Sequence, residues 1–358
     1  MGYRIGLLVT ICIMLIFSCK PSEKGKAKKR DATFYQNPVH NLDFPDPTVI
    51  RANDGSYYAY ATQAVIQNDT FNIQVAKSTD MVNWKFIGDA LPQRPEWAKT
   101  TQEFWAPHAS YDSMTRTYYL YYSGESDDKQ TGKCLGVATS KNPQGPFVDS
   151  GKPLICGTEF VNIDPMAFDD PKTGKKLLYW GSGFLPVKVQ ELSDDRLRFK
   201  ENTIPLDLVL PGKDSDYNIL IEGAWVSYRE GKYYLFYSGD NCCGKKANYA
   251  VMVARADHAQ GPFTRLGETN ESKSSTILIR SEEWNAPGHN SIIVDEAGND
   301  WIFYHAIMTS DSIVAQGEAL DRNDKRVMLL DRVYYKDGWP YVKDRIPSST
   351  KLMAPVTR

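Results

Sequence analysis

The stretch Glu222-Gly223-Ala224-Trp225-Val226, followed by Lys232-Tyr233-Tyr234-Leu235-Phe236-Tyr237, shows how this chain folds. A polar residue opens a short apolar run, and an aromatic-rich run follows it, anchored at Tyr233. Glu230-Gly231 between the two runs is a turn signal of the kind found in β-hairpins. The unit therefore predicts two antiparallel strands, with an acid at the start of the first.

The same unit recurs along the whole chain. Its other openers are Asp46 (Asp46-Pro47-Thr48-Val49-Ile50), His108 (Ala106-Pro107-His108-Ala109), Asp164 (Asp164-Pro165-Met166-Ala167) and His289 (Gly288-His289-Asn290-Ser291). The aromatic-rich runs are anchored at nearly even intervals, at Tyr57, Tyr118, Leu177, Tyr233 and Trp301. A period of roughly 60 residues accommodates one four-stranded sheet, and sheets repeated around an axis make a propeller. With no convincing long amphipathic helix in the sequence, we predict an all-β, five-bladed β-propeller.

The first residues indicate export. Residues 5–17 are apolar but too short to span a membrane comfortably, and Ser18-Cys19 follows them. This resembles a bacterial lipoprotein signal, so residues 1–18 are predicted to be a signal peptide and Cys19 the lipidated first residue. Residues 19–33 then form a flexible tether, and 34–358 the propeller. The expected location is the periplasmic or outer-membrane face of a bacterial cell; an ordinary signal peptide or an uncleaved anchor is the alternative.

Composition excludes one class of partner. The 358 residues carry a formal charge of −2, which gives no electrostatic case for nucleic acid. Aromatic residues make up 12%, and their faces suit both sheet packing and sugar binding. Four cysteines follow the leader, Cys134, Cys156, Cys242 and Cys243, and their spacing does not fix their pairing. Free buried thiols or a bond involving Cys134 or Cys156 both remain open.

Three of the five openers are acids. Equivalent positions of successive blades converge on the propeller axis, so Asp46, Asp164 and Glu222 are expected to meet at one mouth. Each alone has an ordinary explanation, since an Asp before Pro often only caps a turn. All three stand at closely matched distances before the anchor of the next aromatic run, which favours a shared site. Like charges in one pocket raise the pKa of at least one acid, and an acid beside an ionised base is what cleavage of a glycosidic bond requires.

The chain resembles glycoside hydrolase family 43, whose members are five-bladed propellers. The resemblance runs from about Asn37 to about Val342. It rests on Asp43-Phe44-Pro45-Asp46-Pro47, Phe104-Trp105-Ala106-Pro107-His108, Asn162-Ile163-Asp164-Pro165, Ile221-Glu222-Gly223, Gly288-His289-Asn290-Ser291 and Gly338-Trp339-Pro340. Each piece is short, but six in order are specific.

The resemblance implies a role for each acid. Asp46 resembles the general base that activates water, Glu222 the general acid, and Asp164 the third acid that tunes and orients the general acid. Related retaining enzymes usually carry Arg-Asp-Pro and Glu-Cys, whereas this chain has Ile163-Asp164-Pro165 and Glu222-Gly223, so hydrolysis with inversion is expected. Ala224-Trp225 departs from the usual residues after the acid, on the leaving-group side.

The resemblance also suggests ligands. His289 would contact a calcium or other cation in the central channel, which the chemistry itself does not require. Sugar contacts are expected from the following residues: Trp105, His108, Asn162, Trp180, Ser182 and Arg322. A packing role for Trp105 and a surface ion pair for Arg322 are the alternatives.

The substrate expected is plant polysaccharide, specifically α-1,5-linked arabinan. Ser238-Gly239-Asp240-Asn241-Cys242-Cys243 and Tyr179-Trp180-Gly181-Ser182-Gly183-Phe184 are similar to loops of arabinan-cleaving members. A β-xylosidase of the same family and a non-catalytic glycan-binding surface propeller are the alternatives. A phosphate-handling enzyme is disfavoured because no Gly-rich phosphate loop is present.

Overall fold

The computed structural model describes residues 1–2, 34–101, 103–212, 217–311 and 325–357. By its internal contacts the chain divides into Met1–Thr33 and Phe34–Arg358. Apart from residues 1–2, the predicted signal peptide lies outside the described residues, and so does Cys19, the predicted lipidation site. No helix in the described part is long and apolar enough to cross a bilayer.

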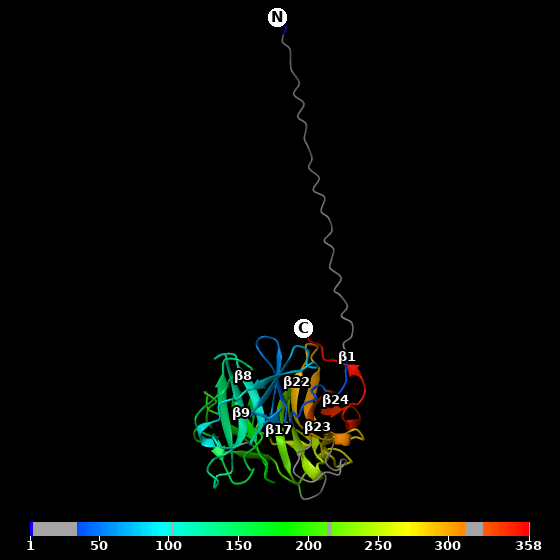
Figure 1. The fold of residues 1–358 in the computed structure, drawn as a ribbon. Helices are drawn as coiled ribbons and strands as arrows, with labels where there is room; N and C mark the ends of the chain where they lie inside the picture. Colours follow the sequence, from blue (N-terminus) through cyan, green and yellow to red (C-terminus); the bar gives the residue numbers. More distant parts are fainter. Residues whose placement is uncertain (3–33, 102, 213–216, 312–324, 358) are drawn as a thin grey trace. The chain divides into compact units, whose positions relative to one another are not determined.

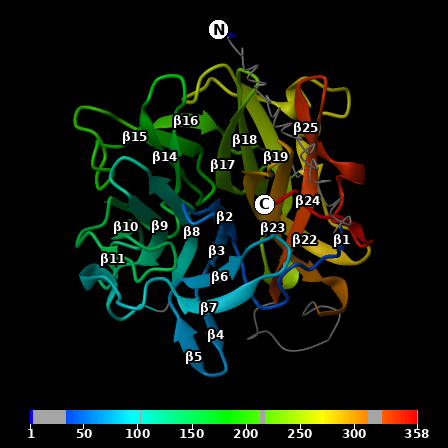
Figure 2. The same ribbon diagram turned by 90° about the horizontal axis from the view of Figure 1, so that it is seen from above.

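The described residues from Phe34 onward form five antiparallel blades arranged around one centre (Figures 1 and 2), together with two two-stranded sheets, one of β4 (Ala64–Ile66) with β5 (Asp69–Phe71) and one described below. Blade 1 contains β2 (Thr48–Arg51), β3 (Tyr57–Ala61), β6 (Gln74–Ser78) and β7 (Lys85–Asp89). Blade 2 contains β8 (Phe104–Asp112), β9 (Thr117–Glu125), β10 (Lys133–Ser140) and β11 (Val148–Asp149), with β12 (Ile155–Cys156) also paired to β10. Blade 3 contains β13 (Met166–Asp169), β14 (Lys176–Trp180), β15 (Val187–Glu191) and β16 (Leu206–Val209).

Blades 4 and 5 repeat this order. Blade 4 contains β17 (Ile221–Arg229), β18 (Lys232–Gly239), β19 (Ala250–Ala256) and β20 (Thr264–Arg265), with β21 (Thr276–Leu278) also paired to β19. Blade 5 contains β22 (Trp284–Val294), β23 (Asp300–Met308), β24 (Arg326–Lys336) and β25 (Trp339–Val342). The five-bladed propeller predicted from the repeat period is therefore confirmed.

The first strands of the blades form a closed ring. Each contacts the next, in the order β2, β8, β13, β17 and β22, and β22 returns to β2. The two ends of the propeller chain also meet, because β1 (Phe34–Tyr35) pairs with β26 (Leu352–Met353) and His40 bridges to Met328 in β24. Equivalent positions of the five repeats, remote in sequence, therefore lie around one axis.

The second strand of each blade explains the aromatic runs. All five residues of β3 are buried, because neighbouring sheets cover both faces of the strand, so its sequence is continuously apolar rather than alternating. The tyrosine hydroxyls within these strands still need partners. Tyr118 donates to Asn53 Oδ1 of blade 1 at 2.7 Å, and Tyr179 donates to the Ala259 carbonyl of blade 4 at 2.7 Å. The same residues therefore supply the core and link the blades.

Candidate active site

Five residues at the entrances of the inner strands share an unusual backbone. Asp46, Ala106, Asp164, Gly223 and His289 have φ of 57°, 43°, 59°, 62° and 48°. This left-handed conformation costs energy for residues other than glycine, so surrounding contacts must hold it. The equivalent residue of blade 2 is therefore Ala106, two positions before the predicted opener His108.

Four of these turns are held in the same way. The backbone N–H of each donates to a side chain on the second strand, or just after it, in the preceding blade. The pairs are Asp46 to His305 Nδ1 (3.1 Å), Ala106 to Thr62 Oγ1 (2.8 Å), Asp164 to Ser123 Oγ (3.0 Å) and His289 to Ser238 Oγ (2.8 Å). We call these four acceptors the cap residues.

Blade 4 departs from the pattern. Its left-handed residue, Gly223, donates its N–H to Asp164 Oδ2 at 2.9 Å, and Ser182, at the cap position, donates instead to Glu222 Oε2 at 2.7 Å. The pairing of β17 with β18 shifts register between Glu222 and Trp225. A Cβ on Gly223 would lie 3.3 Å from His289 Nδ1. Because of this bulge, the carboxylate that enters the site belongs to Glu222, one position before the left-handed Gly223. The bulge also ties Asp164 to the backbone beside Glu222.

The three acids are buried at one pocket. Asp46 is 8% exposed, Asp164 6% and Glu222 9%. The pocket has a volume of about 370 Å³, within the range of small-ligand sites. Its lining consists of Asp46, Thr62, Trp105, Phe160, Ile163, Asp164, Leu220, Glu222, Asn241, Cys242, Cys243, His289 and Arg326.

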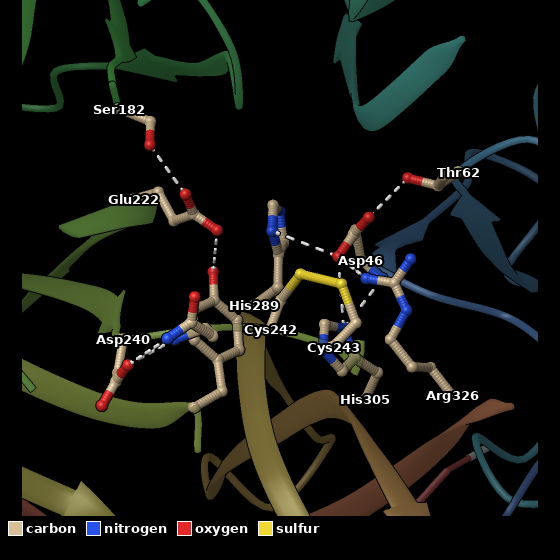
Figure 3. The surroundings of a disulfide bond; sticks show 12 residues. Asp46, Thr62, Ser182, Glu222, Asp240, Cys242, Cys243, His289, His305 and Arg326 are labelled. Carbon is tan, nitrogen blue, oxygen red and sulfur yellow. Dashed lines mark hydrogen bonds and ion pairs between the residues drawn. A yellow bond between two sulfur atoms is a disulfide. The ribbon is translucent and has the colours of Figure 1, made fainter. Parts of the chain in front are cut away.

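Asp46 lies among hydrogen-bond donors and positive charge (Figure 3). Thr62 Oγ1 donates to its Oδ2 at 2.5 Å, and the Arg326 guanidinium lies 3.3 Å from its Oδ1. Burial alone would raise the pKa of Asp46, but Arg326, with His289 and His305, outweighs burial and holds that pKa well below its ordinary value. Asp46 is therefore ionised at neutral pH.

Glu222 lies among hydroxyls on the other side of the pocket. Ser182 donates to its Oε2, and the Tyr249 hydroxyl donates to its Oε1 at 2.8 Å. Burial, reinforced by the Asp46 charge, raises the pKa of Glu222 above its ordinary value despite these two hydrogen bonds. A hydroxyl both donates and accepts, so this surrounding accommodates Glu222 with or without its proton.

The pKa of Asp164 is raised, like that of Glu222. Burial and the negative charges of Glu222 and Asp46 raise the pKa of Asp164 well above its ordinary value, against the Gly223 hydrogen bond. The two acids together therefore retain a proton at a pH where ordinary carboxyls are ionised. The backbone N–H of Gly223 can only donate, so Asp164 Oδ2 accepts it, and the retained proton is held by Asp164 Oδ1 or by Glu222.

Two predicted sugar contacts reach this site. Trp105 lines the pocket, and Lys133 Nζ lies 3.5 Å from its ring centroid. Lys133 therefore occupies one face of the indole. Ser182 touches Glu222 directly.

Three other predicted contacts, Asn162, Trp180 and His108, are not among the residues that line the pocket. Trp180 is in the blade core, where its Nε1 donates to Asn162 Oδ1 at 3.0 Å, so these two residues bind each other. His108 is buried and packs on Trp225, with ring centroids 5.2 Å apart, because its place in the strand lies two residues beyond the turn. Burial lowers the pKa of His108 to about 3. Arg322 lies outside the described residues.

Sequence reasoning missed Arg326, Tyr249 and the cap residues. Arg326 opens β24, four positions after Arg322, and nothing in the sequence ranks one arginine above the other. Tyr249 follows the fourth-blade stretch that ends at Cys243, and its contact with Glu222 spans 27 residues of sequence. The caps Thr62, Ser123 and Ser238 all stand at the same offset after the anchor of their aromatic run, a regularity that could have revealed them.

His289 lies between two of the acids. Its Nδ1 is 3.6 Å from Asp46 Oδ1 and 3.7 Å from Asp164 Oδ2, and burial lowers its pKa. Across the described residues, no group of three or more His, Cys, Asp or Glu side chains is placed to hold a metal ion. This donor set does not fit a cation held by side chains alone, so the cation near His289 stays a prediction and no step below involves it.

Comparison with known proteins identifies the family. Residues 35–340 match the profile of the glycosyl hydrolases family 43, and the chain belongs to that family. It is accordingly a glycosidase that hydrolyses O-glycosyl compounds.

Individual relatives are distant but extend over most of the chain. The extracellular exo-alpha-(1->5)-L-arabinofuranosidase ArbA of Cellvibrio japonicus is 27% identical over 326 residues, covering 85% of this chain and 87% of the relative. The extracellular endo-alpha-(1->5)-L-arabinanase 1 of Bacillus subtilis is 27% identical over 310 residues, covering 82% and 86%.

Solved structures agree on the fold. A thermostable family-43 glycoside hydrolase superposes with a TM-score of 0.72 at 26% identity, covering 90% of this chain and all of that one. The Cellvibrio cellulosa alpha-L-arabinanase complexed with arabinohexaose superposes with a TM-score of 0.68 at 23% identity, covering 85% and 96%.

Proposed function

We propose that this protein hydrolyses α-1,5-linked arabinan by inverting single displacement, with Asp46 as general base and Glu222 as general acid. One observation carries the proposal: two buried carboxylates line one pocket, with surroundings that shift their pKa values in opposite directions. Opposed shifts of this kind are how one site supplies a base and an acid at the same pH.

The steps follow from these surroundings. Ionised Asp46 accepts a proton from water as the water oxygen attacks the anomeric carbon. Glu222 gives its proton to the glycosidic oxygen as the bond to the anomeric carbon breaks. Asp46 ends protonated and Glu222 ionised, and exchange of protons with solvent restores both. Asp164 accepts the Gly223 N–H beside Glu222, and the repulsion between these two acids keeps a proton on the pair.

The names of the relatives support the choice of sugar. Both relatives described above are named for α-1,5-linked arabinose, one as an exo- and one as an endo-acting enzyme. A third, the beta-D-galactofuranosidase xynD of Aspergillus niger, is 27% identical over 334 residues and is also named for a furanose. Arabinan therefore ranks above a β-xyloside as the substrate.

A product assay tests the proposal. We expect purified protein to release arabinose or short arabino-oligosaccharides from debranched arabinan, and to act weakly on xylan and aryl β-xylosides. Ladders of oligosaccharides indicate internal cutting, and arabinose alone indicates terminal cutting. Release from xylan alone would reassign the protein as a β-xylosidase. Binding of arabinan without any turnover would support the glycan-binding alternative instead.

We further propose that the protein is exported and lipid-anchored at Cys19. Several relatives, including those of Cellvibrio japonicus and Bacillus subtilis, are named extracellular, which supports export. Mass spectrometry of the mature N-terminus tests the anchor: a diacylated Cys19 is expected, and any other mature first residue would contradict it.

A further inference from the structure

One wall of the pocket, which we call the sulfur wall, is formed by the side chains of Cys242 and Cys243. Cys242 and Cys243, adjacent in sequence, form a disulfide and line the same pocket as Asp46 and Glu222. Both are only partly buried. Figure 3 shows the S–S bond among Glu222, His289 and Asp46.

Stabilisation of the fold does not explain this bond. A disulfide stabilises mainly by restricting the unfolded chain, and the effect grows with the length of the loop that it closes. Cys134–Cys156 joins strands β10 and β12 across a separation of 22 residues. Cys242–Cys243 has a separation of 1 and closes no loop, so it restricts the unfolded chain very little.

The loop around the bond is held in place. The Asn248 side chain donates to Asp240 Oδ2 at 2.9 Å, and the Asn248 backbone N–H donates to the Asn241 carbonyl at 2.9 Å. Cys242 packs against the buried cluster that contains Tyr249, whose hydroxyl binds Glu222. The sulfur wall therefore packs on the same buried cluster as the tyrosine that binds the acid.

The chemistry of the wall suits one face of a sugar. Disulfide sulfurs are polarizable and weak hydrogen-bond acceptors, whereas the ring of a sugar has C–H groups that need apolar contact. Two large aromatic side chains, Trp105 and Phe160, line the same pocket, and Lys133 lies at one ring face of Trp105. We propose that the Cys242–Cys243 disulfide is a binding platform for the C–H face of a furanose ring next to the scissile bond. This inference rests on the proposed function.

Binding to an inactive enzyme tests the platform separately from turnover. In the Glu222→Gln background, α-1,5-arabinotriose binding is measured by calorimetry for the parent, for Cys242→Ser/Cys243→Ser and for the matched control Cys134→Ser/Cys156→Ser. Serine replaces apolar sulfur surface with hydroxyls, and the lost contact should weaken binding on the order of fivefold. The control should lower the melting temperature and leave the Kd unchanged, because its disulfide does not line the pocket.

Each result decides a different point. Equal affinity of the parent and Cys242→Ser/Cys243→Ser would overturn the platform. If the parent binds neither arabinotriose nor xylotriose, the proposed function fails first. A crystal of the Glu222→Gln protein with arabinotriose gives a second reading that does not depend on the fold of a cysteine variant. A ring carbon within about 4 Å of either sulfur supports the proposal, and a sugar ring bound elsewhere in the pocket overturns it.

Discussion

The two sides of the pocket use one backbone turn in different ways. On the Asp46 side the left-handed residue carries the carboxylate, and the cap residue His305 accepts its N–H. On the Glu222 side the left-handed residue is Gly223, the carboxylate stands one position earlier, and Ser182 binds that carboxylate instead of a backbone N–H. The first arrangement surrounds the Asp46 carboxylate with the Thr62 hydroxyl and the Arg326 guanidinium, and the second surrounds the Glu222 carboxylate with the hydroxyls of Ser182 and Tyr249.

This difference assigns the chemistry. The positive charge of Arg326 favours the ionised form of Asp46, whereas burial and the charge of Asp46 favour the protonated form of Glu222. Position in the turn does not decide this alone, because Asp46 and Asp164 both occupy the left-handed position and their pKa values shift in opposite directions. The shift of one position at Glu222-Gly223 instead places the Glu222 carboxylate against the hydroxyls of Ser182 and Tyr249.

Removing the charge of Asp164 should have the largest effect among the variants outside the acid–base pair. Asp164→Asn keeps an oxygen for the Gly223 N–H but removes the repulsion that raises the pKa of Glu222. That pKa should fall, so the alkaline limb of the pH–rate profile should move to lower pH. We expect kcat to fall on the order of 10²-fold. Asp170→Asn, in the same blade but outside the pocket, should leave the profile unchanged. An unmoved alkaline limb in Asp164→Asn would contradict the role given to Asp164.

Substitution of Gly223 tests the bulge. Gly223→Ala strains a residue with φ of +62° and places a Cβ 3.3 Å from His289 Nδ1, so we expect activity to fall about tenfold. Gly231→Ala is the matched control, because it has φ of +85° and no atom within 4 Å of the added Cβ. Both should lose about 1–2 kcal/mol in urea denaturation, but only Gly223→Ala should lose activity. Equal activities would show that the bulge geometry is not required.

Loss of Arg326 should have the smallest effect at neutral pH. Arg326→Met removes the charge that lowers the pKa of Asp46, so that pKa should rise and the acid limb of the pH–rate profile should move to higher pH. The depressed pKa contributes stability above the unfolded value of about 3.9, and this contribution is lost as pH falls through the folded value. Arg326→Met should therefore lose part of its stability at pH 7. Lys325→Met, which removes a contact to Asn41, is the control and should shift neither quantity.

The fold and the three acids were predictable because both follow from a repeat. The even spacing of the aromatic runs gives the number of blades, and the acids stand at matched positions before those runs. His108 does not follow this rule in blade 2, because the apolar run there begins beside a turn centred on Ala106. A side chain two residues further along a strand lies on the same face of the sheet, but it is farther from the mouth of the propeller channel.

Contacts to the acids from residues distant in sequence could not be predicted in the same way. Tyr249, Arg326 and the cap His305 reach the acids across 27, 280 and 259 residues. Their positions depend on where each loop comes back to the propeller axis. The hydrophobic period of the sequence does not specify this. The disulfide of Cys242 with Cys243 was equally hidden, since spacing leaves pairing open.

The most direct test of the opposed roles of Asp46 and Glu222 is their response to the leaving group. A general acid is needed for a poor leaving group and hardly needed for an acidic phenol, whereas the base is needed for both. We expect kcat/KM of Glu222→Gln to fall on the order of 10²-fold or more on arabino-oligosaccharides but only a few-fold on a dinitrophenyl arabinofuranoside. Asp46→Asn should fall on both substrates. Equal losses for Glu222→Gln on the two substrates, or recovery of Asp46→Asn on the activated one, would contradict the assignment.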